Sequence, residues 1–252
     1  SSFLNLLKVF CVVILVGIIV GIMVMKEPMI SGSGIPQLEG ILGKKIKINW
    51  LKVLFYKFFG GILSLSAGLS VGREGPSVQM GGAVGEGFSK VFKRINIEEK
   101  FLITSGASAG QSAAFNAPLS GVIFALEEVH KNFSPLVLLS AMASSLAADF
   151  VCKQFLGLEP AMSFKNVDVF PLKYYWLLLI MGVFVGISGM IFNKGLLKSQ
   201  DIYGKLKKVP VEIKVAIPFL CAAVVGIMSP ILLGGGHDLI ISLVNEGFTL
   251  KI

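Results

Sequence analysis

The sequence Gly72-Arg73-Glu74-Gly75-Pro76 places two opposite charges inside an otherwise uncharged, glycine-rich run that spans Phe58–Gly85. In so apolar a chain, an ionisable pair at this depth marks a candidate functional site. Pro76 suits the first position of a helix, where its missing N–H and fixed φ cost nothing, and the glycines allow close approach to the backbone. The sequence therefore predicts a helix that starts at Pro76, inside the membrane.

Such a helix start would be an anion-binding feature. Its first N–H groups have no partner within the helix, and together with the helix dipole they attract negative charge. The nearest candidate is the carboxylate of Glu74 itself. An anion that passes this point would compete with Glu74 for the same amides.

The composition indicates an integral membrane protein. Of 252 residues, 54% are hydrophobic and 15% are charged, and the mean hydropathy is +0.80, outside the range of soluble globular proteins. Most of the uncharged runs approach the roughly 20 residues that a membrane-spanning helix needs. These runs are Val9–Met25, Phe58–Gly72, Phe101–Leu126, Asn132–Ala148, Tyr174–Phe192 and Val215–Gly236.

The net charge of +8 comes from lysines and arginines that cluster in the connections, such as Lys44–Lys47, Lys90–Arg94 and Lys205–Lys208. This distribution favours cytoplasmic loops that face anionic lipid, and we expect no nucleic-acid partner. Three cysteines lie in or beside apolar segments without metal-ligand spacing, so we expect neither a disulfide framework nor a metal or other cofactor.

A second glycine-proline sequence, Gly32-Ser33-Gly34-Ile35-Pro36, predicts another helix start. Only about ten residues follow before Lys44, too few to cross a bilayer. The segment offers a second set of free amides and one hydroxyl that can donate to an anion. The alternative is that Ser33 only caps the helix.

The other elements are also expected to be helical. The segment Phe101–Glu128 contains Asn116-Ala117-Pro118, and Pro118 is expected to break it into two part-helices, while its small residues indicate close helix packing. Further helices are expected at Asn49–Ser70, Pro135–Phe155, Tyr174–Lys198 and Val211–Leu233.

One motif would suit an enzyme. Gly106–Gly110 fits the Gly-x-Ser-x-Gly pattern of a nucleophile elbow around Ser108, and His130 or His237 could be imagined as the base. That elbow requires a strand, a turn and a helix, which an all-helical span does not offer. We therefore expect the protein not to be an enzyme, with an intramembrane serine hydrolase kept as the alternative from another class.

Three motifs together resemble the CLC family of chloride channels and chloride/proton exchangers. They are the two glycine-proline sequences and Phe115-Asn116-Ala117-Pro118-Leu119, which is followed by Glu127-Glu128. One pentapeptide would be weak evidence, but three that follow in the family's order at fitting distances are strong evidence.

The resemblance implies an all-α integral membrane fold of multiple tilted and broken helices, built as two inverted repeats, in a homodimer with one anion pathway per subunit. The chain resembles the third through about the twelfth of the family's eighteen or so helices. Residues 1–160 would be most of the first repeat, and residues 161–252 the start of the second. The missing part would complete the anion site, so we attribute transport to a longer parent protein in the inner membrane of a prokaryote.

The resemblance also implies roles for single residues. Glu74 resembles the gating glutamate, and Glu128 resembles the inner proton glutamate found in exchangers. Ser33 resembles the serine whose hydroxyl contacts the central anion and accompanies a preference for chloride over nitrate. The expected anion-binding residues are Ser33, Gly34, Ile35 and Gly75, and the expected supporting residues are Arg73, Pro36 and Pro76.

Burial would favour the protonated form of Glu74, while the helix start and Arg73 would favour the charged form, so a proton could release Glu74 and admit an anion. Alternatively, Arg73 and Glu74 could form a static ion pair, and Glu127 and Lys131 a surface i,i+4 pair at the end of the span. The expected function is proton-coupled chloride/proton antiport. A passive, voltage- or pH-gated chloride channel remains the alternative, and fluoride as substrate stays open.

Overall fold

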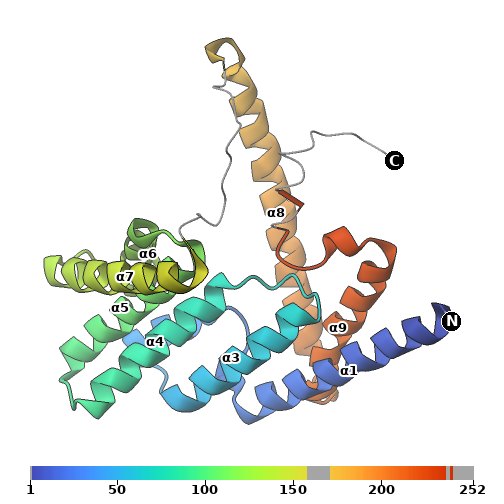
Figure 1. The fold of residues 1–252 in the computed structure, drawn as a ribbon, viewed down its shortest axis with the longest axis horizontal. Coiled ribbons are helices and arrows are strands. Elements are labelled where there is room, and N and C mark those ends of the chain that lie inside the picture. The colour runs from blue at the N-terminus through green and yellow to red at the C-terminus, as the bar shows by residue number, and fades with distance from the viewer. Residues whose placement is uncertain (1, 158–170, 237–238, 241–252) are drawn as a thin grey trace. The chain divides into compact units, whose positions relative to one another are not determined.

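The computed structural model describes residues 2–157, 171–236 and 239–240, and every regular element within these ranges is helical (Figure 1). The α-helices are α1 (Ser2–Lys26), α2 (Ile35–Leu42), α3 (Trp50–Ser66), α4 (Glu74–Val91), α5 (Asn96–Phe115), α6 (Pro118–Phe124), α7 (Pro135–Leu156), α8 (Trp176–Lys205) and α9 (Val211–Met228). Short helical turns are η1 (Pro28–Ile30), η3 (Leu172–Tyr174) and η4 (Pro230–Leu232), and η2 (Ala125–His130) is a π-helix. The all-α prediction is confirmed.

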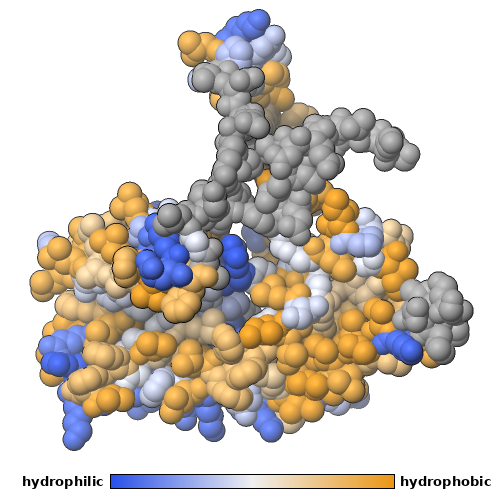
Figure 2. All heavy atoms as spheres, viewed as in Figure 1, coloured by the Kyte–Doolittle hydropathy of each residue, from blue (hydrophilic) through white to orange (hydrophobic). Residues whose placement is uncertain are grey.

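The helices have the lengths and the surface of a membrane protein. Four described segments are long and apolar enough to cross a bilayer, namely Leu7–Lys26, Pro135–Phe155, Trp176–Lys205 and Val211–Met228. Apolar side chains dominate the part of the visible face formed by α1, α3 and α4 (Figure 2). Phe55, Phe58 and Phe59 of α3 are all exposed, as expected for side chains that face lipid.

The chain divides into two compact units, one formed by Ser1–Ser163 with Val211–Ile252 and the other by Phe164–Pro210. In the second unit, α8 carries exposed apolar side chains such as Phe184 and Phe192. All candidate site residues within the described ranges belong to the first unit. This division does not test the boundary between the two expected repeats at residue 160.

Helices α4 and α5 pack with their backbones in contact. A Cβ atom added at Gly81 would collide with the carbonyl oxygen of Gly106, and one added at Gly110 would collide with that of Ser77. The residue numbers of the contacting positions increase along α4 while they decrease along α5, so the two helices are antiparallel. The expected close packing of small residues is confirmed, and glycine is required at this crossing.

The short helix α2 runs beside α4 in the same direction. Gly34 lies against Gln79 and Leu38 lies against Gly82, so the residue numbers of the contacting positions increase together along the two helices. Buried Leu38, Val78, Ile103 and Val129 belong to one apolar cluster that joins α2, α4, α5 and η2. This cluster fixes the two glycine-proline helix starts relative to each other.

Several boundaries differ from the sequence predictions. Helix α4 begins at Glu74, two residues before Pro76, so the prediction that Pro76 takes the first helical position is wrong. Proline is still tolerated there, because the N–H groups of the first turn have no intrahelical acceptor. Helix α9 ends at Met228 rather than Leu233, since Ser229 precedes Pro230 and adopts an extended conformation.

The predicted break at Pro118 is confirmed. Helix α5 ends at Phe115, Asn116 takes the left-handed conformation with φ 56°, and α6 starts at Pro118. The chain then continues directly from α6 into the π-helix η2, which carries Glu128. Helix α3 was expected over Asn49–Ser70 but runs from Trp50 to Ser66, and Asn49 is its N-cap, whose side chain accepts a hydrogen bond from Lys52 N–H.

Candidate functional site

The two glycine-proline helix starts are in direct contact. A Cβ atom added at Gly75 would lie 2.6 Å from the carbonyl oxygen of Ser33 and 3.1 Å from its Cα atom. A Cβ atom added at Gly34 would lie 2.6 Å from Oε1 of Gln79. The start of α2 therefore packs on the first turns of α4, and only glycine fits at both positions. Two sets of helix-terminal amides come together here.

Ser33 lies exposed just before α2. Its hydroxyl oxygen is 3.4 Å from the backbone nitrogen of Ile35, which is a long and weak hydrogen bond. The residue in the N-cap position is Gly34, with φ 96°. Ser33 is therefore not the N-cap residue that the alternative reading required. A weak acceptor contact leaves the hydroxyl hydrogen free to donate to an anion.

The backbone before Ser33 is held by a buried cation that the sequence reading missed. Lys57 Nζ donates hydrogen bonds to the carbonyl oxygens of Ile30 and Gly32 at 2.8 and 2.7 Å, and the residue is only 5% exposed. Its position inside the aromatic run Phe55–Phe59 was the one available signal, because a lysine there must find acceptors or leave the membrane.

Two glutamines hold the same loop. Gln79 Nε2 donates to the carbonyl oxygen of Met29 at 2.7 Å, and Gln37 Nε2 donates to that of Ser31 at 2.7 Å. Side chains from α2, α3 and α4 thus hold successive carbonyl groups between Met29 and Gly32. Because these carbonyl groups all accept hydrogen bonds, the backbone that leads into Ser33 is held in one conformation.

Glu74 is half-buried at the first position of α4. Its carboxylate folds back over Gly72, where an added Cβ would lie 2.5 Å from Oε2, and Gly72 has φ 67°. Arg73 is exposed, and among the described residues no ion pair joins it to Glu74. The structure therefore lacks the static ion pair considered as an alternative.

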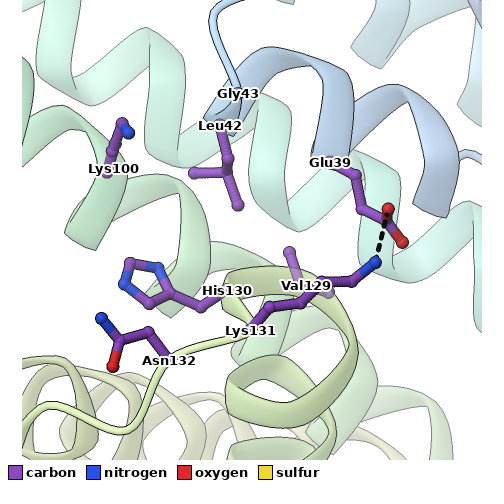
Figure 3. A pocket seen from close by; sticks show the side chains of 8 residues that line it. All are labelled: Glu39, Leu42, Gly43, Lys100, Val129, His130, Lys131 and Asn132. Carbon is purple, nitrogen blue, oxygen red and sulfur yellow. Dashed lines mark hydrogen bonds and ion pairs between the residues drawn. The ribbon is translucent and has the colours of Figure 1, made fainter.

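Glu128 lies exposed on the π-helix η2, and no side-chain hydrogen bond or ion pair joins its carboxylate to another described residue. The suggested pair of Glu127 with Lys131 is wrong, because Lys131 Nζ bonds Glu39 Oε2 at 2.9 Å instead (Figure 3). The hydrogen bond and the charge of Glu39 raise the pKa of Lys131, which lies in the connection after η2. A π-helix within a helical span often marks a functional position.

The structure does not bring Glu74 and Glu128 together. Glu74 begins α4, whereas η2 lies beside the first half of α5, because His130 Nδ1 is 2.9 Å from Oγ1 of Thr104 in that half. Since α4 and α5 are antiparallel, the beginning of α5 lies toward the far end of α4. The candidate gate and the candidate proton residue are therefore separated along the helix axis.

The nucleophile-elbow alternative fails on geometry. Ser108 lies in the middle of the continuous helix α5, is fully buried, and shares a 2.6 Å hydrogen bond with Ser145 Oγ. His130 contacts Thr104 rather than Ser108, and His237 lies outside the described residues. No strand precedes Ser108 in the described chain, so the required strand-turn-helix is missing.

Comparison with known proteins supports a single family. Residues 16–252 match the family described as "Voltage gated chloride channel". The H(+)/Cl(-) exchange transporter ClcA of Salmonella typhimurium (strain LT2) is 38% identical over 221 residues, which cover 84% of this chain and 46% of the relative. The ClcA transporter of Salmonella newport (strain SL254) matches over the same shares. The chain thus spans about half the length of these curated relatives.

Solved structures agree on the fold. A slow cyanobacterial Cl−/H+ antiporter superposes with a TM-score of 0.86 at 32% identity, covering 97% of this chain and 58% of that one. A CLC-type fluoride/proton antiporter gives a TM-score of 0.72 at 21% identity, covering 100% of this chain and 73% of that one. At that identity, the second match speaks for the fold alone.

Proposed function

The chain belongs to the voltage gated chloride channel (CLC) family, a family of transporters and not of enzymes, and from that premise we propose that it forms part of a proton-coupled chloride/proton antiporter. The observation that carries the proposal is the contact between the two glycine-proline helix starts. Gly75 against Ser33 and Gly34 against Gln79 bring together amides that suit a partly dehydrated anion. Ser33, Gly34, Ile35 and Gly75 are the proposed anion-binding residues.

Glu74 is the proposed gate. Its carboxylate stands at the first turn of α4, beside the amides that an anion would use, and no described side chain pairs with it. Protonation removes its negative charge, so the interaction with the helix start weakens and an anion can take its place. Arg73, Pro36 and Pro76 are the proposed supporting residues, since they shape the two helix starts.

Glu128 is the proposed inner proton residue. It is exposed at the end of a helical span, so it can exchange a proton with water, and it stands apart from the anion-binding amides. A passive channel needs no carboxylate at that point. A 38% identical relative that bears the name of an H(+)/Cl(-) exchange transporter adds support for exchange over passive conduction.

Chloride is the proposed anion, protons are the coupled ion, and the lipid bilayer is the environment. We further propose a homodimer in the inner membrane of a prokaryote, as the family resemblance implies. Fluoride is disfavoured as the substrate by the serine hydroxyl at position 33, since the resemblance associates that serine with chloride.

Flux measurements in liposomes test the proposal. The native-length protein is reconstituted, and a chloride gradient is imposed with no proton gradient. Antiport predicts that chloride drives protons uphill, and Glu74→Gln should abolish this coupled proton movement. Glu98→Gln, which removes an exposed carboxylate at the start of α5, is the control and should retain it.

Two results would refute the assignment. If chloride moves without driving protons in the unmodified protein, the protein is a passive channel. If Glu74→Gln still pumps protons in proportion to chloride, Glu74 is not the gate.

A further inference from the structure

An open pocket of about 340 Å³ lies where α2 ends, α5 begins and η2 passes toward α7 (Figure 3). Its polar lining consists of Glu39, Lys100, His130, Lys131 and Asn132. None of these residues belongs to the proposed anion-binding set around Ser33. The pocket therefore offers a separate group of charged and polar side chains.

The lining has an excess of positive charge. Lys131 and Glu39 neutralise each other through their 2.9 Å ion pair on one side of the pocket. Lys100 lies on the other side with His130 and Asn132 (Figure 3), and it takes part in no ion pair among the described residues. Thr104 Oγ1 donates its proton to the carbonyl oxygen of Lys100 at 2.8 Å, so it accepts from His130 Nδ1–H at 2.9 Å, and the other ring nitrogen of the neutral imidazole is an acceptor rather than an anion ligand. This wall can offer the ammonium of Lys100 and the amide N–H groups of Asn132 to an anion.

The pocket lies at the strongly basic end of this unit. The connection after α2 carries Lys44, Lys45 and Lys47, and it lies beside the end of α4, since Lys90 Nζ is 3.4 Å from the carbonyl oxygen of Ile48. Lysine-rich ends of membrane proteins face the cytoplasm, where the leaflet carries anionic lipid. The pocket thus faces the side on which phosphate-bearing head groups are concentrated.

Two exposed apolar residues lie close in the sequence to the pocket-lining residues Lys100 and Asn132. Ile97 precedes Lys100 by three residues on the same face of α5 and is 61% exposed. Phe133 follows Asn132 and is 69% exposed. A free phosphate would gain nothing from these side chains, whereas acyl chains attached to a bound head group would cover them.

We propose that this pocket binds the phosphate of an anionic lipid, with Lys100 and Asn132 around the head group and the acyl chains against Ile97 and Phe133. Basic pockets between membrane helices on the cytoplasmic side are suited to such head groups. The ion pair of Lys131 with Glu39 closes the opposite wall. Binding at this site requires neither Glu74 nor an anion at Ser33.

Native mass spectrometry of the native-length protein in detergent tests the proposal. Phosphatidylglycerol and phosphatidylcholine are titrated separately, so that both probes carry a phosphate but only the first has a net negative charge. We expect tighter binding of phosphatidylglycerol, and Lys100→Gln should weaken it about fivefold, as expected for loss of one cation near a membrane surface.

Lys47→Gln is the matched control, because it removes an exposed lysine from the same basic end without altering the pocket. Equal losses for Lys47→Gln and Lys100→Gln would overturn the proposal, since the lipid would then be held by general charge. In a separate arm, millimolar inorganic phosphate is added. If it displaces phosphatidylglycerol in a manner that depends on Lys100, the pocket is a site for free phosphate and the lipid assignment is wrong.

Discussion

At the scale of single residues, Lys57 is the side chain on which the arrangement before Ser33 most depends. A buried ammonium is costly unless its hydrogen-bond donors find partners, and Lys57 satisfies two of them with the carbonyl groups of Ile30 and Gly32. The same two bonds hold the backbone that leads into the proposed anion site. Within the described residues, no carboxylate neutralises Lys57, so its positive charge also acts on that site.

We therefore predict that Lys57→Met destabilises the protein and weakens chloride binding. The change leaves two carbonyl groups without their donor, and buried unpaired groups cost about 1 to 3 kcal/mol each. Thermal unfolding in detergent should show the loss of stability, and isothermal titration with chloride should show a several-fold lower affinity. Lys52→Met on the exposed side of α3 is the control, and equal effects of the two variants would contradict this role.

A second prediction at this scale concerns Ser33. Its hydroxyl can donate to an anion, whereas proline offers no donor, so Ser33→Pro should raise the nitrate flux relative to the chloride flux. Competition between the two anions in liposomes measures the ratio. Ser31→Ala removes a neighbouring hydroxyl as the control. An unchanged ratio in Ser33→Pro would show that selectivity arises elsewhere.

At the scale of elements, the antiparallel packing of α4 against α5 fixes the position of the first turn of α4 along the α5 axis. The glycines on both helices let backbone touch backbone, and the cluster of Leu38, Val78 and Ile103 then ties α2 to the pair. Glycine is therefore required at some helical positions and not at others. Gly81 and Gly106 face another backbone, whereas Gly61 in α3 has no atom within 4 Å of an added Cβ.

This contrast makes a paired prediction. Gly81→Ala should destabilise the protein by about 1 to 3 kcal/mol, because the new methyl group has to push the two backbones apart. Gly61→Ala should be neutral or stabilising by up to about 1 kcal/mol, since alanine is the better helix former and the space is open. Unfolding midpoints in one detergent compare the two variants, and a tolerated Gly81→Ala would mean that the helices can shift without penalty.

The elements also show what could be predicted from the sequence. The start of α2 and the break at Pro118 were predictable because proline and glycine act locally on the chain. The partner of the glycines on α4, the acceptors of Lys57 and the ion pair of Lys131 with Glu39 were not, because they join residues far apart in the sequence. The π-helix around Glu128 has no local signature, so its position too required the structure.

At the scale of the whole molecule, the proposed gate and the proposed proton residue stand at different levels of the helical bundle. Glu74 begins α4, a helix of 18 residues and therefore about 27 Å long at 1.5 Å per residue. The π-helix η2, which carries Glu128, lies beside the first half of the antiparallel α5 and therefore toward the other end of α4. The anion-binding amides lie beside Glu74, so a proton that travels between the two carboxylates must follow a course partly distinct from that of the anion.

That separation predicts that the two fluxes can be uncoupled at Glu128. Glu128→Gln keeps the size of the side chain but cannot carry a proton, so chloride movement should continue while proton movement falls by at least tenfold. Glu127→Gln is a matched control, because Glu127 is the adjacent residue on the same π-helix and is also exposed. Parallel recordings of chloride and pH in liposomes give both rates. If a chloride gradient still pumps protons through Glu128→Gln at the rate of the control, Glu128 is a surface carboxylate and protons enter by another group.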